Sequence, residues 1–412
     1  MFRLVIQQSG IDLIKKKNSY LFEKIITMLN DSLFIRKTTS KESMFYMRFY
    51  NQTGTIVTVS GLNTLFTNPT GSPTLTSAVV ERAGGVITNV LAGGSSINNF
   101  TVTNGESCVF RMTWINGMYP LAGNTPVTYQ NIVRSAGYRL VGSYNVPTSF
   151  MAYLFYNCIN YNQQVGDVFD VSGWTPTSIG NTFMYNTWYT CTSLTNAAVP
   201  NTSHWNITTI GTLFLGHCWR GCTSLVTAVV PDTSNWSVTT FNNDFMGYTW
   251  YNCTSLVNSA VPDTSNWRPI RMWATFLDST WYNCSSMVHC VSPDTSNWSI
   301  TTIDGYWLYA TWWNCSSMVT CVAPDSTLWN VGGTPSIFVN MAWGSGAFSA
   351  NTSLQRELTL KGSIYIQKAL YVNSGGLDNA RISNVKVDTG LIPNFQASTY
   401  WSNIDDNKFI SW

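Results

Sequence analysis

The stretch that decides the fold is "TWYNCTSLVNSAVPDTSNW", Thr249–Trp267, which returns 31 positions later as "TWYNCSSMVHCVSPDTSNW", Thr280–Trp298. Both copies keep two tryptophans, a cysteine, a proline and an aspartate in the same places. Self-similarity at a fixed period of this length is typical of solenoids and of arrays of small units. The sequence therefore predicts a chain built from repeated turns.

The repeat extends in both directions as columns of like residues. One tryptophan column comprises Trp174, Trp205, Trp236, Trp267, Trp298 and Trp329; a second comprises Trp188, Trp219, Trp250, Trp281 and Trp312. Cysteines recur at Cys191, Cys222, Cys253, Cys284 and Cys315, and Cys158 lies 33 residues before the first of them. Burying four or five large apolar side chains contributes about 8–12 kcal/mol per unit, whereas ordering the backbone costs upward of about 30 kcal/mol. One unit alone cannot be stable, so the units must stack.

Within a unit, three segments have local signals. "SLV" (Ser255 to Val257) is typical of a short strand, and "WSVTTF" (Trp236 to Phe241) alternates β-branched residues as an extended segment does. "PDTSNW" has the composition of a turn, because Pro fixes φ while Asp, Thr and Ser bond nearby backbone amides. We expect a β-rich fold: a parallel, leucine-rich-repeat-like solenoid of about 31-residue units flanked by β domains.

The phrase "FYNCINYNQQVGDVFDVSGW" (Phe155 to Trp174) and the recurring C-[ST]-S-[LM] and P-D-T-S-N-W-S-[VI]-T-T-[IF] patterns resemble the BspA-like leucine-rich repeats of bacterial and protist surface proteins, the type also found in mycoplasma surface lipoproteins. The resemblance covers roughly residues 150–340. The family unit is about six residues shorter. The extra length here is expected between the phenylalanine and cysteine columns, because Phe245 precedes Cys253 by eight residues and Phe155 precedes Cys158 by three.

The flanks differ from the repeat in composition. Residues 1–43 are basic, with eight Lys/Arg and four Asp/Glu giving +4, and residues 11–36 have apolar residues at helical spacing. Residues 44–150 and 346–412 alternate turn residues with β-type runs such as "TIVTVS" and "ELTLKGSIYI". We expect a helical N-terminal segment or one with no stable role (1–43), a β-rich N-terminal domain or cap (44–150), the solenoid (151–345) and a β-rich C-terminal cap (346–412).

Charge argues against nucleic acid as a partner. Charged residues make up 10% of the chain, and residues 151–345 hold three Arg and nine Asp, giving −6. Nucleic-acid binding relies on clustered positive charge. No run approaches the about 20 apolar residues of a membrane span, and the start of the sequence has no recognisable signal peptide. This composition suits an extracellular, cell-surface or virion protein.

An aromatic residue follows each tryptophan of the second column, and this set is the best candidate for ligand contact. If the stretch is extended, adjacent side chains point to opposite faces, so one of each pair should be exposed. The predicted surface stripe comprises Tyr189, Tyr251, Tyr282 and Trp313. The tryptophan columns themselves should fill the core.

The cysteines and aspartates have two interpretations each. The column cysteines are small buried residues that pack the coil, or they form disulfides; Cys290 and Cys321, which are 31 residues apart, are the best candidate pair. The aspartates Asp232, Asp263, Asp294 and Asp325 cap turns, or they form a calcium ladder. No zinc-like spacing accompanies His217, Cys218 and Cys222, so we predict no metal site and no cofactor.

Catalytic motifs do not stand out either. The three histidines occupy different repeat positions, and no nucleophile elbow, phosphate loop or paired-acid motif occurs. The leading hypothesis is a non-enzymatic adhesion or binding protein that uses the solenoid as a scaffold for a protein or glycan on a host or partner surface, and that forms a homo-oligomer or acts alone. The alternatives are a structural component of a virion, such as a head or tail fibre, and a carbohydrate-binding protein.

Overall fold

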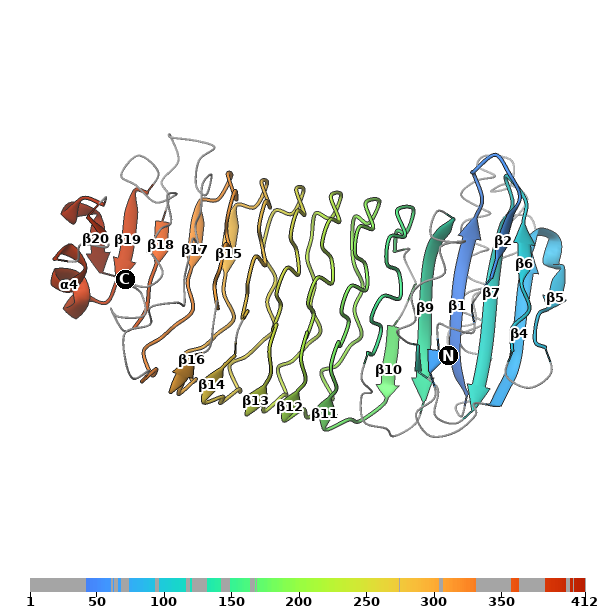
Figure 1. Ribbon diagram of the computed structural model, residues 1–412, viewed down its shortest axis with the longest axis horizontal. Helices are drawn as coiled ribbons and strands as arrows, with labels where there is room; N and C mark the ends of the chain where they lie inside the picture. Colours follow the sequence, from blue (N-terminus) through green and yellow to red (C-terminus); the bar gives the residue numbers. More distant parts are fainter. Residues whose placement is uncertain are drawn as a thin grey trace, which may run out of the picture.

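The computed structural model describes residues 42–60, 62, 66–67, 74–92, 96–115, 119–120, 132–141, 149–163, 167, 169–273, 275–303, 307–330, 357–362, 382–397, 401–402 and 404–411. The chain is strand-rich and forms a parallel β-solenoid of about six turns that are about 31 residues apart, as the repeat predicted. Figure 1 shows an elongated molecule, with a sheet at the N-terminal end, stacked coils in the middle and a small helix at the C-terminal end. The predicted helical segment 11–36 lies outside the described residues.

A six-stranded sheet covers the N-terminal end. Its strands are β1 (Ser43–Tyr50), β4 (Thr74–Arg82), β5 (Ile87–Asn89), β7 (Ser107–Ile115), β9 (Val133–Val141) and β10 (Phe169–Gly173). Their order is β10-β9-β1-β7-β4-β5, and every pair is antiparallel except β10 with β9. Because β10 belongs to the first coil, the sheet passes directly into the solenoid (Figure 1).

Smaller elements accompany this sheet. They are two antiparallel pairs, β2 (Val57–Val59) with β6 (Phe100–Val102) and β3 (Phe66–Thr67) with β8 (Tyr119–Pro120), and the 3-10 turn η2 (Ala83–Gly85). Phe100 stacks on Phe110 of β7 with ring centroids 6.0 Å apart. The β2–β6 pair therefore shares the core of the larger sheet.

One edge of the solenoid carries a row of two-residue strands, seen along the bottom of Figure 1. They are β11 (Ser178–Ile179), β12 (Thr209–Ile210), β13 (Thr240–Phe241), β14 (Arg271–Met272) and β16 (Thr302–Ile303), and the second residue of each is buried. The row is interrupted between β13 and β14. There Pro269 takes the place of Val238 in the preceding unit.

A second row forms a five-stranded parallel sheet of β15 (His289–Val291), β17 (Thr320–Val322), β18 (Glu357–Thr359), β19 (Asn384–Val387) and β20 (Phe409–Ser411). Isolated parallel bridges continue this row backwards through Asn258, Thr227 and Asn196. Strand pairing in this row thus begins two residues after the leucine column. The strand predicted at "SLV" (Ser255 to Val257) is therefore wrong in position, because pairing starts only at Asn258. Parallel register also runs on into residues 357–411, where η4 (Thr389–Leu391), α4 (Ile392–Gln396) and η6 (Asp406–Lys408) follow. The domain boundaries stay predictions.

Both tryptophan columns stack through the centre. Trp236, Trp267 and Trp298 lie 6.4 and 6.3 Å apart between ring centroids, with interplanar angles of 3° and 1°. In the second column, Trp219, Trp250 and Trp281 lie 5.6 and 5.8 Å apart. All members of the two columns are at most 6% exposed. Like side chains therefore meet from coil to coil and fill the core.

The backbone that carries the second column is a chain of tight turns. Non-glycine residues with positive φ recur along it, such as Met246 (57°), Tyr248 (56°) and Asn252 (63°). The amides of Tyr248 and Asn252 donate to carbonyls of the next coil at Asp278 and Tyr282. Positive φ is costly for L-residues, and these inter-coil hydrogen bonds offset that cost. The extended conformation considered for this segment in the sequence analysis therefore does not occur here.

In the first coil, one residue belongs to a different column from the one inferred from the sequence. Phe150 stacks on Phe183 at 5.3 Å, and Phe155 stacks on Trp188 at 6.0 Å. Phe155 therefore belongs to the second tryptophan column, and Phe150 occupies the phenylalanine column, eight residues before Cys158. The shortened spacing inferred for this unit is wrong. The two extra residues of the unit lie between Asn162, which accepts from Thr195, and Trp174, which packs on Trp205.

Candidate functional site

The candidate site is a line of partly exposed side chains beside the second tryptophan column. Trp250 is fully buried and the next residue, Tyr251, is partly exposed. The same holds for Trp188 and Tyr189, for Trp281 and Tyr282, and for Trp312 and Trp313. Each tight turn sends its two neighbouring aromatic side chains to opposite sides, so the four predicted stripe residues do share one face of the solenoid.

These residues form a stacked ladder. Ring centroids of Tyr251 and Tyr282 are 4.6 Å apart with an interplanar angle of 7°, and Tyr282 and Trp313 are 6.1 Å apart at 14°. At the other end, Tyr189 stacks on Tyr156 at 4.8 Å. We call the set Tyr156, Tyr189, Arg220, Tyr251, Tyr282 and Trp313 the aromatic stripe.

Arg220 occupies the rung between Tyr189 and Tyr251. Its guanidinium carbon lies 5.7 Å from the Tyr189 ring centroid and 4.5 Å from that of Tyr251, and it is 5.4 Å from Tyr248. Guanidinium groups bind favourably over tyrosine rings. A planar cation thus replaces one ring without breaking the ladder.

Sequence reasoning missed two members of the stripe. Tyr156 lies 33 residues before Tyr189 and so falls outside a 31-residue alignment. Arg220 fits that alignment but is not aromatic. The signal that could have found it is its place directly after Trp219, where the other units have Tyr or Trp.

A second row of aromatic residues runs beside the stripe. His217 stacks on Tyr248 at 4.7 Å and meets the edge of Tyr185 at 5.5 Å, and Tyr185 meets Tyr153 at 5.4 Å. Tyr248 in turn contacts Tyr251 of the stripe at 5.8 Å. The two rows together widen the aromatic face around Arg220.

The geometry limits how a ligand can touch this face. Within the stripe the rings stack on one another, so most of their faces are covered and little ring face is left for a sugar ring to stack on. The ring edges and phenol groups remain accessible. The hydroxyl groups of Tyr156, Tyr189, Tyr251 and Tyr282 make no hydrogen bond with any residue the structure describes. The face therefore offers hydrogen-bonding groups at coil spacing.

His217 orients Arg220. The Arg220 Nη1 atom donates to His217 Nδ1 at 3.3 Å. Burial, and then the Arg220 charge, lower the pKa of His217 to about 4. The imidazole is therefore neutral at pH 7 and can accept this hydrogen bond, which leaves the guanidinium charge uncompensated. Arg220 has no carboxylate partner within the part of the chain that the structure describes.

Two aspartates lie near the second row. Asp278 is 7% exposed and accepts from Ser279 Oγ at 2.7 Å. Burial, with a smaller contribution from Asp244, raises the pKa of Asp278 to about 6. This carboxyl is therefore still mostly ionised at pH 7, but it forms no ion pair with Arg220 in the described part of the chain.

The predicted cysteine positions serve packing. In the five-residue cysteine column each Sγ donates to a carbonyl of the preceding coil, for example Cys253 to Trp219 and Cys284 to Trp250, both at 3.1 Å. Burial raises the pKa of these thiols above the ordinary range. Cys290 and Cys321 are register partners on neighbouring strands, as their spacing indicated, but no disulfide joins them. Trp312 Nε1 instead donates to Cys290 Sγ at 2.9 Å.

The aspartate column caps turns. Asp263 accepts from the Ser265 amide at 3.0 Å and from its hydroxyl at 2.7 Å, and Asp232, Asp294 and Asp325 repeat the amide bond. Thr264, which follows Asp263, is fully buried and donates to the Asp294 carbonyl of the next coil at 2.5 Å. In the described residues, no group of three or more His, Cys, Asp or Glu is placed to hold a metal ion.

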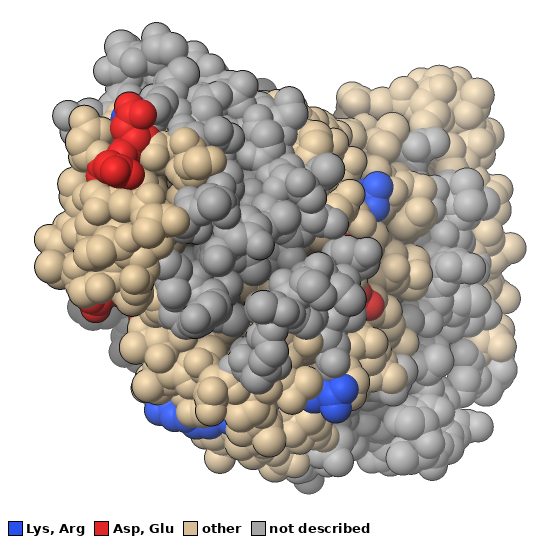
Figure 2. All heavy atoms as spheres, turned by 60° about the vertical axis from the view of Figure 1, so that its left-hand side comes forward, with Lys and Arg blue, Asp and Glu red and all other residues tan. Residues whose placement is uncertain are grey.

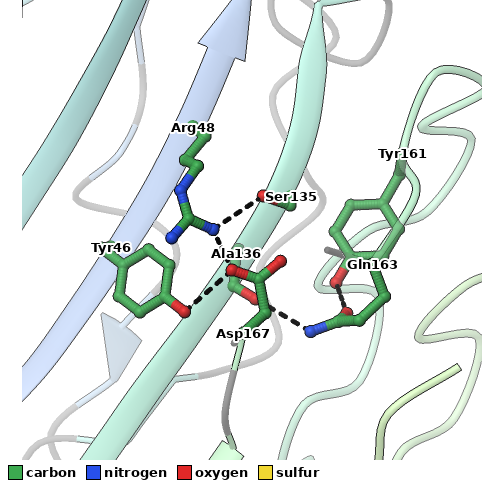
Figure 3. A network of polar contacts seen from close by, with 7 residues as sticks. All are labelled: Tyr46, Arg48, Ser135, Ala136, Tyr161, Gln163 and Asp167. Atoms are coloured by element: carbon green, nitrogen blue, oxygen red, sulfur yellow. Dashed lines mark hydrogen bonds and ion pairs between the residues drawn. The ribbon is translucent and has the colours of Figure 1, made fainter. Parts of the chain in front are cut away.

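A buried polar network joins the N-terminal sheet to the first coil (Figure 3). Asp167 accepts from Tyr46 Oη at 2.9 Å and forms an ion pair with Arg48, which also donates to Ser135 Oγ at 3.1 Å. Beside it, Gln163 Nε2 donates to the Ala136 carbonyl at 3.4 Å. The Asp167 side chain is fully buried, so the network fixes the joint and offers no surface to a ligand.

The described part of the face in Figure 2 carries few charged side chains. Blue and red atoms occupy only small, separate areas of it. No helix in the described residues is long and apolar enough to cross a membrane.

The sequence matches no protein-family model and none of the curated proteins searched. The BspA-like resemblance therefore stays a proposal.

Proposed function

We propose that this chain is a non-enzymatic binding or adhesion protein, that the solenoid is its scaffold, and that the aromatic stripe with its neighbouring row is its ligand surface. The observation that carries the proposal is the continuous ladder from Tyr156 to Trp313, in which every rung is partly exposed. Such a ladder is rigid before binding, so little conformational entropy is lost when a ligand docks.

The surroundings of the ladder support binding rather than catalysis. Tyr and Arg are the residues most enriched at binding hot spots. In contrast, the buried thiols are protonated and the neutral His217 is occupied by Arg220. A surface display of this scaffold, on a cell or a virion, is consistent with its composition. The resemblance to BspA-like surface repeats favours the cell-surface version.

The test uses beads coated with the full chain and surfaces coated with mucin, with enzymatically deglycosylated mucin or with albumin. We expect retention of wild-type beads on at least one glycoprotein surface and loss of retention for a Tyr251→Ala/Tyr282→Ala variant. A matched control is Tyr50→Ala, which removes a partly exposed tyrosine from β1, away from the solenoid.

Two outcomes contradict the proposal. One is retention of the double variant at the wild-type level, which removes the stripe as the ligand surface. The other is no retention of the wild type on any coated surface. Near-ultraviolet circular dichroism of the double variant checks that the buried tryptophan columns are intact.

A further inference from the structure

The ladder contains one cation, and its setting is specific. Tyr189 and Tyr251 lie on either side of the Arg220 guanidinium, and Tyr248 lies diagonally beside it. These contacts hold the group in place beside the rings. Arg220 is partly exposed, so a ligand can reach the N–H groups that His217 does not use. A guanidinium presents five N–H donors, so several remain for an incoming acceptor.

A fixed guanidinium edge matches one kind of partner best. Carboxylates accept two parallel N–H bonds from arginine, and such pairs are shorter and stronger than neutral hydrogen bonds. Because His217 is neutral and no carboxylate of the described residues pairs with Arg220, the positive charge is free to attract an anion. The tyrosine rings on each side lower the local polarity and strengthen that attraction.

The acidic balance of the repeat region disfavours a ligand with many negative charges. Residues 151–345 carry a net charge of −6, so a polyanion or a strongly acidic peptide is repelled. Around Arg220, the stripe offers phenol hydroxyls of Tyr156, Tyr189, Tyr251 and Tyr282 that have no partner among the described residues. A ligand with one carboxylate among many neutral hydroxyl groups satisfies both features.

We propose that Arg220 is the anion-binding centre of the aromatic stripe and that its ligand is a glycan with an acidic sugar, such as a sialic or uronic acid, whose carboxylate pairs with the guanidinium edge while the flanking tyrosine hydroxyls bond the sugar hydroxyls. This inference rests on the proposed function and names the ligand class of the same surface. It replaces ring-face stacking, for which the ladder leaves little room, with edge contacts.

The experiment compares immobilised glycans that share one neutral core. The arms end in galactose, in sialic acid, in glucuronic acid or in sulfated galactose, and a peptide with one Asp in a Gly/Ser sequence provides a further surface. Binding of the full chain is measured by surface plasmon resonance for the wild type and for Arg220→Gln, Arg220→Lys and Arg268→Gln. Arg268 is the matched control, because it is exposed and donates to the carbonyls of Ser265 and Trp267 away from the stripe.

We expect the carboxylated glycans to bind about tenfold more tightly than the neutral one, and Arg220→Gln to lose that preference. Arg220→Lys should retain part of it, since it keeps the charge and loses the planar fork. Arg268→Gln should bind within about twofold of the wild type, since it lies outside the site. The comparison among glycans needs no variant, so a folding defect in Arg220→Gln cannot hide a negative result.

Several results overturn the inference. They are equal binding of neutral and carboxylated glycans, unchanged preference in Arg220→Gln, preference for the sulfated arm alone, and equal binding of the Asp peptide. If stripe-dependent retention on mucin persists in any of these cases, the proposed function stands and only the ligand class is wrong. If the Tyr251→Ala/Tyr282→Ala variant is still retained on mucin, the stripe itself is wrong.

Discussion

Two ladders run side by side through this molecule, one residue apart in sequence and on opposite sides of the same turns. The inner ladder begins at Phe155, continues with tryptophan in the next five coils, from Trp188 to Trp312, and is fully buried. The outer ladder, one position later, varies among Tyr, Arg and Trp and is partly exposed. The near-uniform inner positions are those that packing dictates. Under the proposed function, the variable outer positions are those that contact a ligand.

The largest expected effect is a difference in folding stability between a variant of the inner ladder and a variant of the outer ladder. Trp250→Ala opens a large cavity between two stacked coils and should lower the free energy of unfolding by about 3–5 kcal/mol. Tyr251→Ala should cost less than about 1 kcal/mol, because its ring is already partly in water. Urea denaturation followed by circular dichroism measures both. Similar losses for the two variants would erase the distinction between the ladders.

A conservative change sharpens the same comparison. The indole nitrogens of Trp219, Trp250 and Trp281 have no hydrogen-bond partner among the described residues. Trp250→Phe keeps an aromatic ring in the stack and removes such a buried N–H, so it should cost clearly less than Trp250→Ala. A loss as large as that of the alanine variant would mean that the indole nitrogen is needed after all.

The next effect concerns Asp278, which lies beside the second aromatic row yet is buried. Its pKa is about 6 in the folded chain, above the ordinary value of 3.8. The folded state therefore holds the proton more tightly, and its stability is greatest below about pH 4 and falls as the pH rises through 6. Asp278→Asn keeps an acceptor for Ser279 and removes this penalty.

The Asp278→Asn variant should be more stable than the wild type by about 1–2 kcal/mol at pH 7 and equal to it near pH 3.5. Thermal or urea unfolding at several pH values provides the measurement. Asp263→Asn, at an exposed turn, is the control and should show no comparable gain. A pH-independent difference for Asp278→Asn would contradict the assigned burial.

Much of this arrangement could be predicted from the sequence, because a 31-residue period makes the buried columns visible as columns. Trp267 and Trp298, for example, stack as their spacing indicated. The short strands could not be placed, since a two-residue strand such as Thr240–Phe241 is fixed by its neighbours above and below and leaves no alternation to recognise. Phe155 was assigned to the wrong column because Phe and Trp both occur three residues before a column cysteine.

The proposed ligand face was predictable only in part. The tyrosines follow the period, so Tyr251 and Tyr282 could be placed on one surface from their spacing alone. Arg220 could not, because its role comes from the rings above and below it and not from its own residue type. The turn conformation was also hidden, since positive φ at residues such as Met246 and Leu277 has no glycine signal in the sequence.

A smaller effect on stability is expected from the hydrogen bonds that threonine side chains make between coils. Thr264 is buried and donates to the Asp294 carbonyl, whereas Thr239 is exposed and its bond to the Thr208 carbonyl is 3.5 Å long. Thr264→Val should cost about 1–2 kcal/mol, because it removes the inter-coil hydrogen bond that the buried Thr264 hydroxyl donates. Thr239→Val should be nearly neutral. Equal effects would mean that the inner threonines only fill space.

The last prediction is that the buried column cysteines do not react with an alkylating reagent in the folded chain. Burial raises the pKa of the Cys253 and Cys284 thiols, so they stay protonated and shielded at pH 8. Iodoacetamide should leave both unmodified in the folded chain and modify both in concentrated guanidinium chloride, as mass spectrometry would show. Rapid modification of the folded chain would place these cysteines nearer to the outer face than the structure does.

The parallel indoles have an optical consequence. Rings held 5.4–6.2 Å apart at nearly fixed angles, as along Trp188 to Trp312, are close enough for excitation energy to pass from one tryptophan to the next before emission. A quencher placed at one end of this column should therefore dim the fluorescence of the whole column and not of one ring alone. Loss of a single coil would interrupt this transfer, so the light emitted by the protein reports whether its stack is whole.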